Sequence, residues 1–213
     1  MTDAQVDGVT PAPRRWLVSG ALLSLTGSAQ DPSGGGVRDA LLMALALTRR
    51  GGRTTPDDVV AGVLGVLGQL GWVASQQVRT ATDVPARAVP AALLPSADAA
   101  TLAPLQHLPT GAARAWAAFL AAPGSRAALV VQGTAGTAPD PVLQLLHVDL
   151  TAAVPAVGFP WAHVASPGTL VRHTATLSAD TTVWTAEERA TLATKVSGAV
   201  ATQVVDLTAR STT

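Results

Sequence analysis

The chain has 213 residues, of which 13% are charged, and its 14 basic and 14 acidic side chains give a formal net charge of zero. The charged share is about half of the share that is usual in soluble domains. Nucleic acid is excluded as a partner, because phosphate backbones require a clustered basic surface and the arginines of this chain are scattered. Zero net charge gives little protection against self-association, so we expect a homo-oligomer or a protein partner.

The composition also bears on the origin of the chain and on its domain organisation. Cysteine, tyrosine, isoleucine and asparagine are absent, and Lys195 is the single lysine. This usage is typical of a high-GC bacterial genome, so the excess of alanine and valine is not by itself a structural signal. No shift in composition marks a linker between two folded halves. We predict a disordered N-terminal arm over residues 1–15, a single α+β domain over 16–209 and a frayed tail over 210–213.

The segment that begins at Arg14 and Arg15 has two interpretations. An apolar run follows the two arginines, and it predicts a first strand over Trp16–Thr26. The same residues resemble a twin-arginine export signal, with a small-residue site at residues 27–29. Such signals are loosely defined, so the strand is preferred, and a cytoplasmic location with it. No run reaches the roughly 18–20 apolar residues that a membrane-spanning helix needs.

The most informative stretch is Val37–Val73, which predicts two short and almost wholly apolar helices. The first covers Val37–Leu47, the second begins at Thr55, and a basic turn joins them. The glycine-rich residues 31–36 before the first helix predict a flexible loop. A helix that is apolar all round must be buried in a core, against a partner or in lipid. Which of these three applies is the main functional question that the sequence poses.

The second helix has clear start signals and an unusual row of glycines. Thr55 is a good N-cap, Pro56 suits the first helical position, and Asp57 and Asp58 face the positive end of the helix dipole. Glycines recur every third residue and therefore share one slowly drifting face, which would let another backbone approach closely. That backbone is the first helix or a sheet, or else a neighbouring subunit or a bilayer partner. The glycines that we nominate as interaction residues are Gly62, Gly65 and Gly68.

The remaining patterns predict strands and two further helices. Alternation over Trp72–Val84 places Val73, Ser75 and Arg79 on one mostly polar face. A helix over Thr110–Ala122 follows, and the capping box at Thr185 opens a long amphipathic helix that ends near Leu207. Three more strands are predicted, the first two of them adjacent in space: Arg126–Thr134, Val142–Thr151 and Thr169–Ser178. The fold class is therefore α+β, with an antiparallel or mixed sheet of about four to five strands covered by the apolar helix hairpin and the C-terminal amphipathic helix.

The search for chemistry is mostly negative. His147 and Asp149 share one face of a strand, and with His163 or His173 they could form a metal site. No cysteine and no short helical histidine pair supports that reading, so no metal and no cofactor is predicted. The paired carboxylates at both helix starts are explained by capping, and no Gly-x-Ser-x-Gly pattern occurs. No catalytic residue is nominated.

One aromatic cluster is a candidate contact loop. Phe159 and Trp161 flank Pro160 in a segment bounded by proline and glycine. Tryptophan in such positions either anchors a core, with its N–H toward a polar partner, or contacts a ligand or membrane surface. We nominate Phe159 and Trp161 as further interaction residues.

Three classes of function follow from these patterns. The first is a non-enzymatic self-assembling or partner-binding protein that uses the helix hairpin (37–73) and the aromatic loop (159–161). The second is a membrane-active protein whose hairpin inserts into lipid, since the order of elements is similar to that of bacterial pore-forming toxins at the level of class alone. The third is a metal-dependent enzyme that uses the histidine-bearing strands. The first is preferred because the chain combines low charge, zero net charge and an apolar hairpin.

Overall fold

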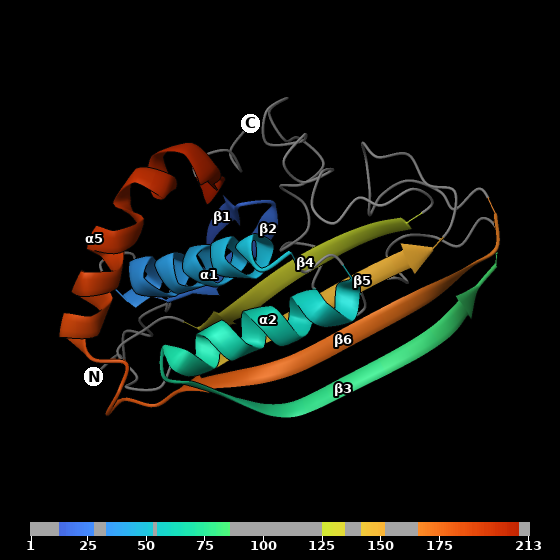
Figure 1. Ribbon diagram of the computed structural model, residues 1–213, viewed down its shortest axis with the longest axis horizontal. Helices are drawn as coiled ribbons and strands as arrows, with labels where there is room; N and C mark the ends of the chain where they lie inside the picture. The colour runs from blue at the N-terminus through green and yellow to red at the C-terminus, as the bar shows by residue number, and fades with distance from the viewer. Residues whose placement is uncertain are drawn as a thin grey trace, which may run out of the picture.

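The computed structural model describes residues 13–27, 33–52, 55–85, 125–134, 142–151 and 166–208. In these ranges one mixed sheet of seven strands carries three helices, as Figure 1 shows. The strands are β1 (Arg14–Val18), β2 (Ala21–Thr26), β3 (Trp72–Val84), β4 (Ser125–Thr134), β5 (Val142–Thr151), β6 (Gly168–Ala179) and β7 (Val204–Asp206). The helices are α1 (Ser33–Arg50), α2 (Pro56–Gln69) and α5 (Ala186–Gln203). The α+β class is confirmed.

The predicted sheet size of four to five strands was too small. The strand order is β3-β6-β5-β4-β2-β1-β7, and every neighbouring pair is antiparallel except β2 and β4. The two additional strands come from segments that were read as parts of longer elements. The adjacency of β4 and β5 was predicted and is confirmed.

The first extra strand arises from a tight turn inside the segment predicted as one strand. Ser19 and Gly20 both adopt positive φ, of 47° and 89°, and they join β1 to β2 as a two-residue hairpin. Such turns match the twist of the flanking strands and need residues that tolerate positive φ. Arg14 and Arg15 therefore lie in β1, inside the stretch predicted as a disordered arm.

The second extra strand is the end of the predicted C-terminal helix. Thr185 caps α5 as expected, since its side chain accepts from the backbone N–H of Glu188. The helix ends at Gln203, and Val204 to Asp206 then pair with β1 as β7. Two consecutive β-branched valines favour a strand. Pairing with the edge of β1 then holds these residues as a strand instead of a further helical turn.

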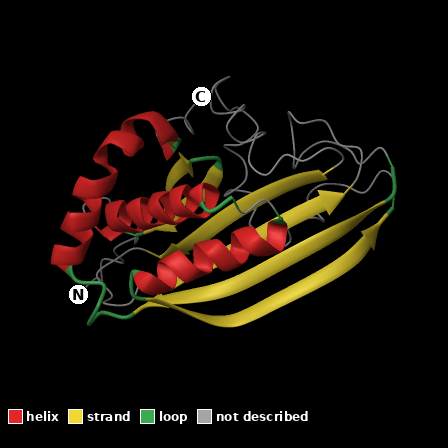
Figure 2. Cartoon of the chain, viewed as in Figure 1, coloured by secondary structure: helices red, strands yellow, loops and turns green. Residues whose placement is uncertain are grey.

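The three helices cover one face of the sheet, as Figure 2 shows. α1 lies between α2 and α5, and the residues predicted as a flexible loop before it, Ser33–Gly36, form its first turn. The core beneath the helices contains apolar side chains from all three helices and from six strands, among them Leu23, Leu42, Leu67, Leu129, Leu177 and Val196. Within the described ranges, no helix is both long and apolar enough to cross a membrane.

The strand alternation predicted for β3 is broken by a bulge. The register with β6 shifts between Ser75 and Val78, where Gln76 has a φ of 50°. A bulge inserts an extra residue, so every side chain beyond it changes face. Arg79 was therefore assigned to the wrong face. It lies opposite His173 on the helix-covered face, whereas Val73 and Ser75 lie on the other.

Candidate functional site

A row of polar side chains crosses three neighbouring strands on the helix-covered face. The register places Arg79 of β3 opposite His173 of β6, and His173 opposite His147 of β5. The two imidazole rings have centroids 5.9 Å apart and planes tilted by 57°. Directly opposite residues of an antiparallel pair are the closest side-chain neighbours in a sheet, so the row follows from the register alone.

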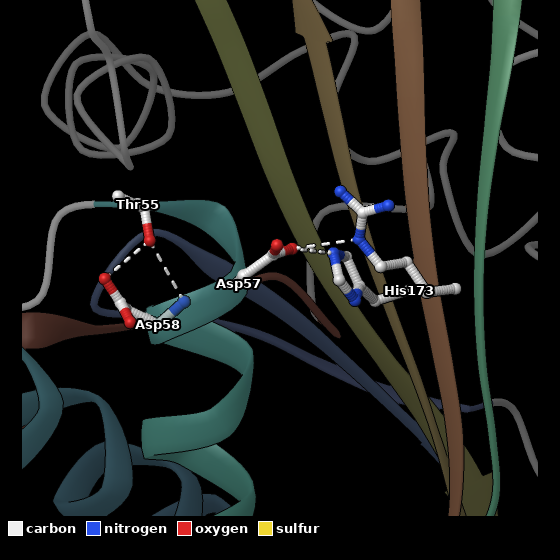
Figure 3. Close-up of polar contacts among 5 residues, drawn as sticks. Thr55, Asp57, Asp58 and His173 are labelled. Carbon is white, nitrogen blue, oxygen red and sulfur yellow. Dashed lines mark hydrogen bonds and ion pairs between the residues drawn. The ribbon is translucent and has the colours of Figure 1, made fainter.

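Asp57 reaches this row from the first turn of α2, as Figure 3 shows. Its Oδ1 atom lies 2.7 Å from Nε2 of His173 and 3.2 Å from Nε of Arg79. The capping box fixes the start of the helix, because Thr55 accepts from the backbone N–H of Asp58 at 3.2 Å and donates to the Asp58 carboxylate at 2.6 Å. Asp58 thus serves the cap, and the neighbouring Asp57 is left to contact the sheet.

Burial and charge set the protonation of this row. The hydrogen bond from Arg79 is the main cause that holds the pKa of the Asp57 carboxyl below its usual value, and the positive charge of Arg79 and the nearby His173 act in the same direction. Burial lowers the pKa of His147 to about 3, with a further lowering from His173. His147 is fully buried, and neither of its ring nitrogens has a hydrogen-bond partner in the described part of the chain. It is therefore neutral at neutral pH.

His147 and His173, two histidines of the predicted metal site, both lie in this row. Asp149 lies on the same face of β5 as His147, as predicted, but His163 falls outside the described residues. In the ranges that the structure describes, no group of three or more histidine, cysteine, aspartate or glutamate side chains is placed to hold a metal ion. The contacts that the row does make join the start of α2 to strands β3 and β6.

A second candidate site is a groove on the outer surface of the helices. It has a volume of about 330 Å³ and lies between α1, α2 and α5. Its apolar lining is Met43, Leu47, Val66, Leu70, Val183, Trp184 and Leu192, and its polar lining is Gln69, Glu188, Thr191 and Lys195. We call it the interhelical groove. Leu47 and Val183 are 40% and 45% exposed, so the groove presents apolar surface to its surroundings.

A smaller hollow of about 200 Å³ continues from the groove along α1 and α2. Leu47, Val66 and Gln69 line both, and Gly62 and Gly65 line the hollow. The two depressions therefore form one continuous surface on the outside of the helix hairpin.

The three nominated glycines differ in their exposure to solvent. Gly62 is buried, whereas Gly65 and Gly68 are exposed. A Cβ atom built on either exposed glycine would meet nothing within 4 Å. For these two, the expected close packing on the first helix or on the sheet was wrong, because they point away from both. Phe159 and Trp161 lie outside the described residues, as does the predicted helix at Thr110–Ala122.

Sequence reasoning missed the junction between α2 and the sheet. Asp57 was read only as a helix-start residue, and Arg79 was assigned to the opposite face. The usable signal was the pair Asp57-Asp58 after a Thr55 cap, because a capping box needs only the second of the two carboxylates.

No known family model, no curated protein and no solved structure matches this chain.

Proposed function

We propose that this chain is a non-enzymatic protein that works by self-assembly, and that its contact surface is the interhelical groove with the adjoining hollow on α1 and α2. The observation that carries the proposal is the continuous apolar surface beside the exposed Leu47. Contiguous exposed apolar surface rimmed by polar groups is typical of protein–protein contacts. Gly65 adds a flat stretch to this surface, where a partner could approach the helix backbone closely.

The rim of the groove favours a second copy of the same chain as the partner. Glu188 and Lys195 are exposed residues of α5 that line the groove. They are seven residues apart, which places them two helical turns apart on about the same side of the helix. Neither takes part in an ion pair within the described ranges.

These two charges are self-complementary. A twofold axis that passes α5 near Thr191 would bring Glu188 of one copy to Lys195 of the other, and the reverse pair would form by symmetry. Isologous contacts of this kind are the commonest basis of homodimers. A net charge of zero also means that two copies meet without long-range repulsion.

Charge reversal tests the proposal. Glu188→Lys and Lys195→Glu should each weaken the dimer, because each places like charges opposite one another across the axis. The double exchange should restore it. The measurement is the dissociation constant from sedimentation equilibrium. A chain that stays monomeric in all four forms would contradict self-assembly, and a dimer that none of the changes affects would contradict the groove as its interface.

A further inference from the structure

A hollow of about 240 Å³ lies on the face of the sheet opposite the helices, across strands β3 to β6. Its hydrogen-bonding side chains are Gln76, Gln132, Gln144, Thr174 and Thr176. The apolar side chains Val78, Val130 and Leu146 complete its walls and floor. We call it the glutamine hollow. Because it lies on the face of the sheet opposite the helices, it is separate from both the polar row and the interhelical groove.

The register explains how the polar side chains come together. Gln132 pairs with Gln144 across β4 and β5, and Gln144 pairs with Thr176 across β5 and β6. The Gln132 amide donates to the Gln144 carbonyl at 3.1 Å, which fixes the orientation of both amides. The bulge of β3 faces the end of this row, since Ser75 is opposite Thr176 and the shift follows directly after it.

Gln76 lines the hollow because of an unfavourable backbone conformation. Strict alternation from Val73 would point residue 76 toward the helices, but the bulge and a φ of 50° bring it to the hollow. A non-glycine residue in the left-handed region is uncommon. Strained residues of this kind, and bulges that redirect a side chain, are concentrated at functional sites.

The lining of the hollow defines the chemistry of a ligand. None of the described residues that line it is charged, so on this part of the lining a charged ligand would lose its hydration without gaining a counter-charge. Glutamine amides and threonine hydroxyls both donate and accept hydrogen bonds, as the hydroxyls of a sugar do. Val130 and Leu146 also line the hollow, and they add apolar side chains that suit the carbon-bound hydrogens of a sugar. The volume is below the range of pockets for drug-sized ligands and suits one sugar ring.

We infer that the glutamine hollow binds a neutral sugar unit, with Gln76, Gln132 and Gln144 as its hydrogen-bonding residues. An extended peptide fits less well, because a peptide pairs along the edge of a sheet, whereas this hollow runs across the strands. The sugar could be free or could be the end of a glycan. The two sources share the same chemistry in the hollow and are separated by the probes below.

The test is titration of the full chain with methyl β-D-glucoside, methyl N-acetyl-β-D-glucosaminide and chitotriose into the millimolar range. The readouts are calorimetry and the side-chain amide signals of glutamine in NMR spectra. We expect saturable binding of at least one probe that shifts glutamine amide signals. Tighter binding of chitotriose than of both monosaccharides would indicate a glycan end, and equal or weaker binding would indicate a free sugar.

Two neighbouring substitutions make the test specific. Gln76→Gly removes the side chain but suits a positive φ, so it should not lower the melting temperature. It should weaken sugar binding about three- to tenfold, the change expected for one hydrogen bond. Gln77→Ala is the matched control, because Gln77 lies in the same bulge but does not line the hollow. Absence of saturable binding for all three probes, or equal weakening by the two substitutions, would overturn the inference.

Discussion

The two helices of the hairpin look alike in sequence but occupy different environments. α1 is buried on almost every side, and even its polar residues Asp39 and Thr48 are 2% and 3% exposed. α2 buries one stripe, represented by Val63, and leaves its other side open at Gly65 and Gly68. α1 is enclosed because α2 and α5 pack on both of its flanks and strands lie beneath it. Among the described helices, only α1 is a neighbour of α2.

The sequence left open whether the apolar hairpin is covered by the core, by a partner or by lipid, and the answer differs between the two helices. An apolar helix must be covered by something, and α1 is covered by the chain itself except near its C-terminal end, where Leu47 is 40% exposed. The exposed apolar surface of the hairpin is narrower than the sequence indicated, since within the described ranges it lies along the outside of α2 and in the groove that Leu47 lines. Insertion of the hairpin into lipid would require α1 to leave its contacts with α5 and the sheet.

The largest expected effect is a loss of stability at low pH, caused by the buried His147 beneath α2. His147 is neutral in the folded chain, with a pKa of about 3, whereas an unfolded histidine has a pKa of about 6.5. The stability that it contributes is therefore complete above about pH 6.5 and is lost progressively as the pH falls toward 3. We expect the free energy of unfolding to fall by several kcal/mol over this window. His147→Leu should flatten the fall in urea titrations at successive pH values, and an unchanged slope would contradict a buried neutral histidine.

The next largest effect is the stability lost when a leucine of each helix is shortened to alanine. Leu42 of α1 is fully buried, so Leu42→Ala should lower the free energy of unfolding by about 2–5 kcal/mol. Leu64 of α2 is only partly buried, and Leu64→Ala should cost less than half as much. Urea denaturation of both variants measures the difference. Equal losses would show that α2 is enclosed as fully as α1.

A smaller effect of opposite sign is expected at the exposed Gly68, which lies outside the lining of the groove and hollow. Gly68→Ala should raise the free energy of unfolding by up to about 1 kcal/mol, because alanine is the better helix former and the added methyl group meets nothing within 4 Å. Gly71→Ala is the control that should destabilise, because Gly71 has a φ of 87° and its Cβ would lie 2.8 Å from Val183. These changes are read from thermal unfolding at one protein concentration.

The smallest effect concerns the contact that joins α2 to the sheet. The pKa of Asp57 is lowered, so its contribution to stability is present above the ordinary carboxyl pKa of about 4 and is lost as the pH falls through the lowered value. The Asp57 side chain is 59% exposed, and solvent screening limits the contribution to a few tenths of a kcal/mol. Asp57→Asn should show this loss at neutral pH and low salt. A loss that high salt leaves unchanged would indicate a cause other than charge.

The parts of the fold that the sequence predicted are those whose signals are local. The Thr55 and Thr185 caps, the bounds of β3 and β5 and the α+β class all follow from patterns within a few residues. The turn at Ser19-Gly20 was missed because Ser-Gly is a weaker turn signal than Asn-Gly. The end of α5 was missed because pairing of β7 with the edge of β1 is a tertiary contact.

The candidate sites were less predictable than the fold, for the same physical reason. A bulge shifts the face of every later residue in a strand, so the position of Arg79 depended on one unpredicted backbone conformation at Gln76. The interhelical groove depends on where α5 packs against α1, which no local pattern encodes. The exposure of Gly65 likewise depends on which flank of α2 is left uncovered.

The most direct measurement is the molar mass of the chain by light scattering coupled to size exclusion, over a range of concentrations. We expect a dimer for the natural chain and a monomer for Leu47→Glu, which places a charge in the interhelical groove. Val142→Glu should remain dimeric, because Val142 is also 40% exposed but lies on β5, away from the groove. A monomer at every concentration for the natural chain, or loss of the dimer in both variants, would contradict self-assembly through this groove.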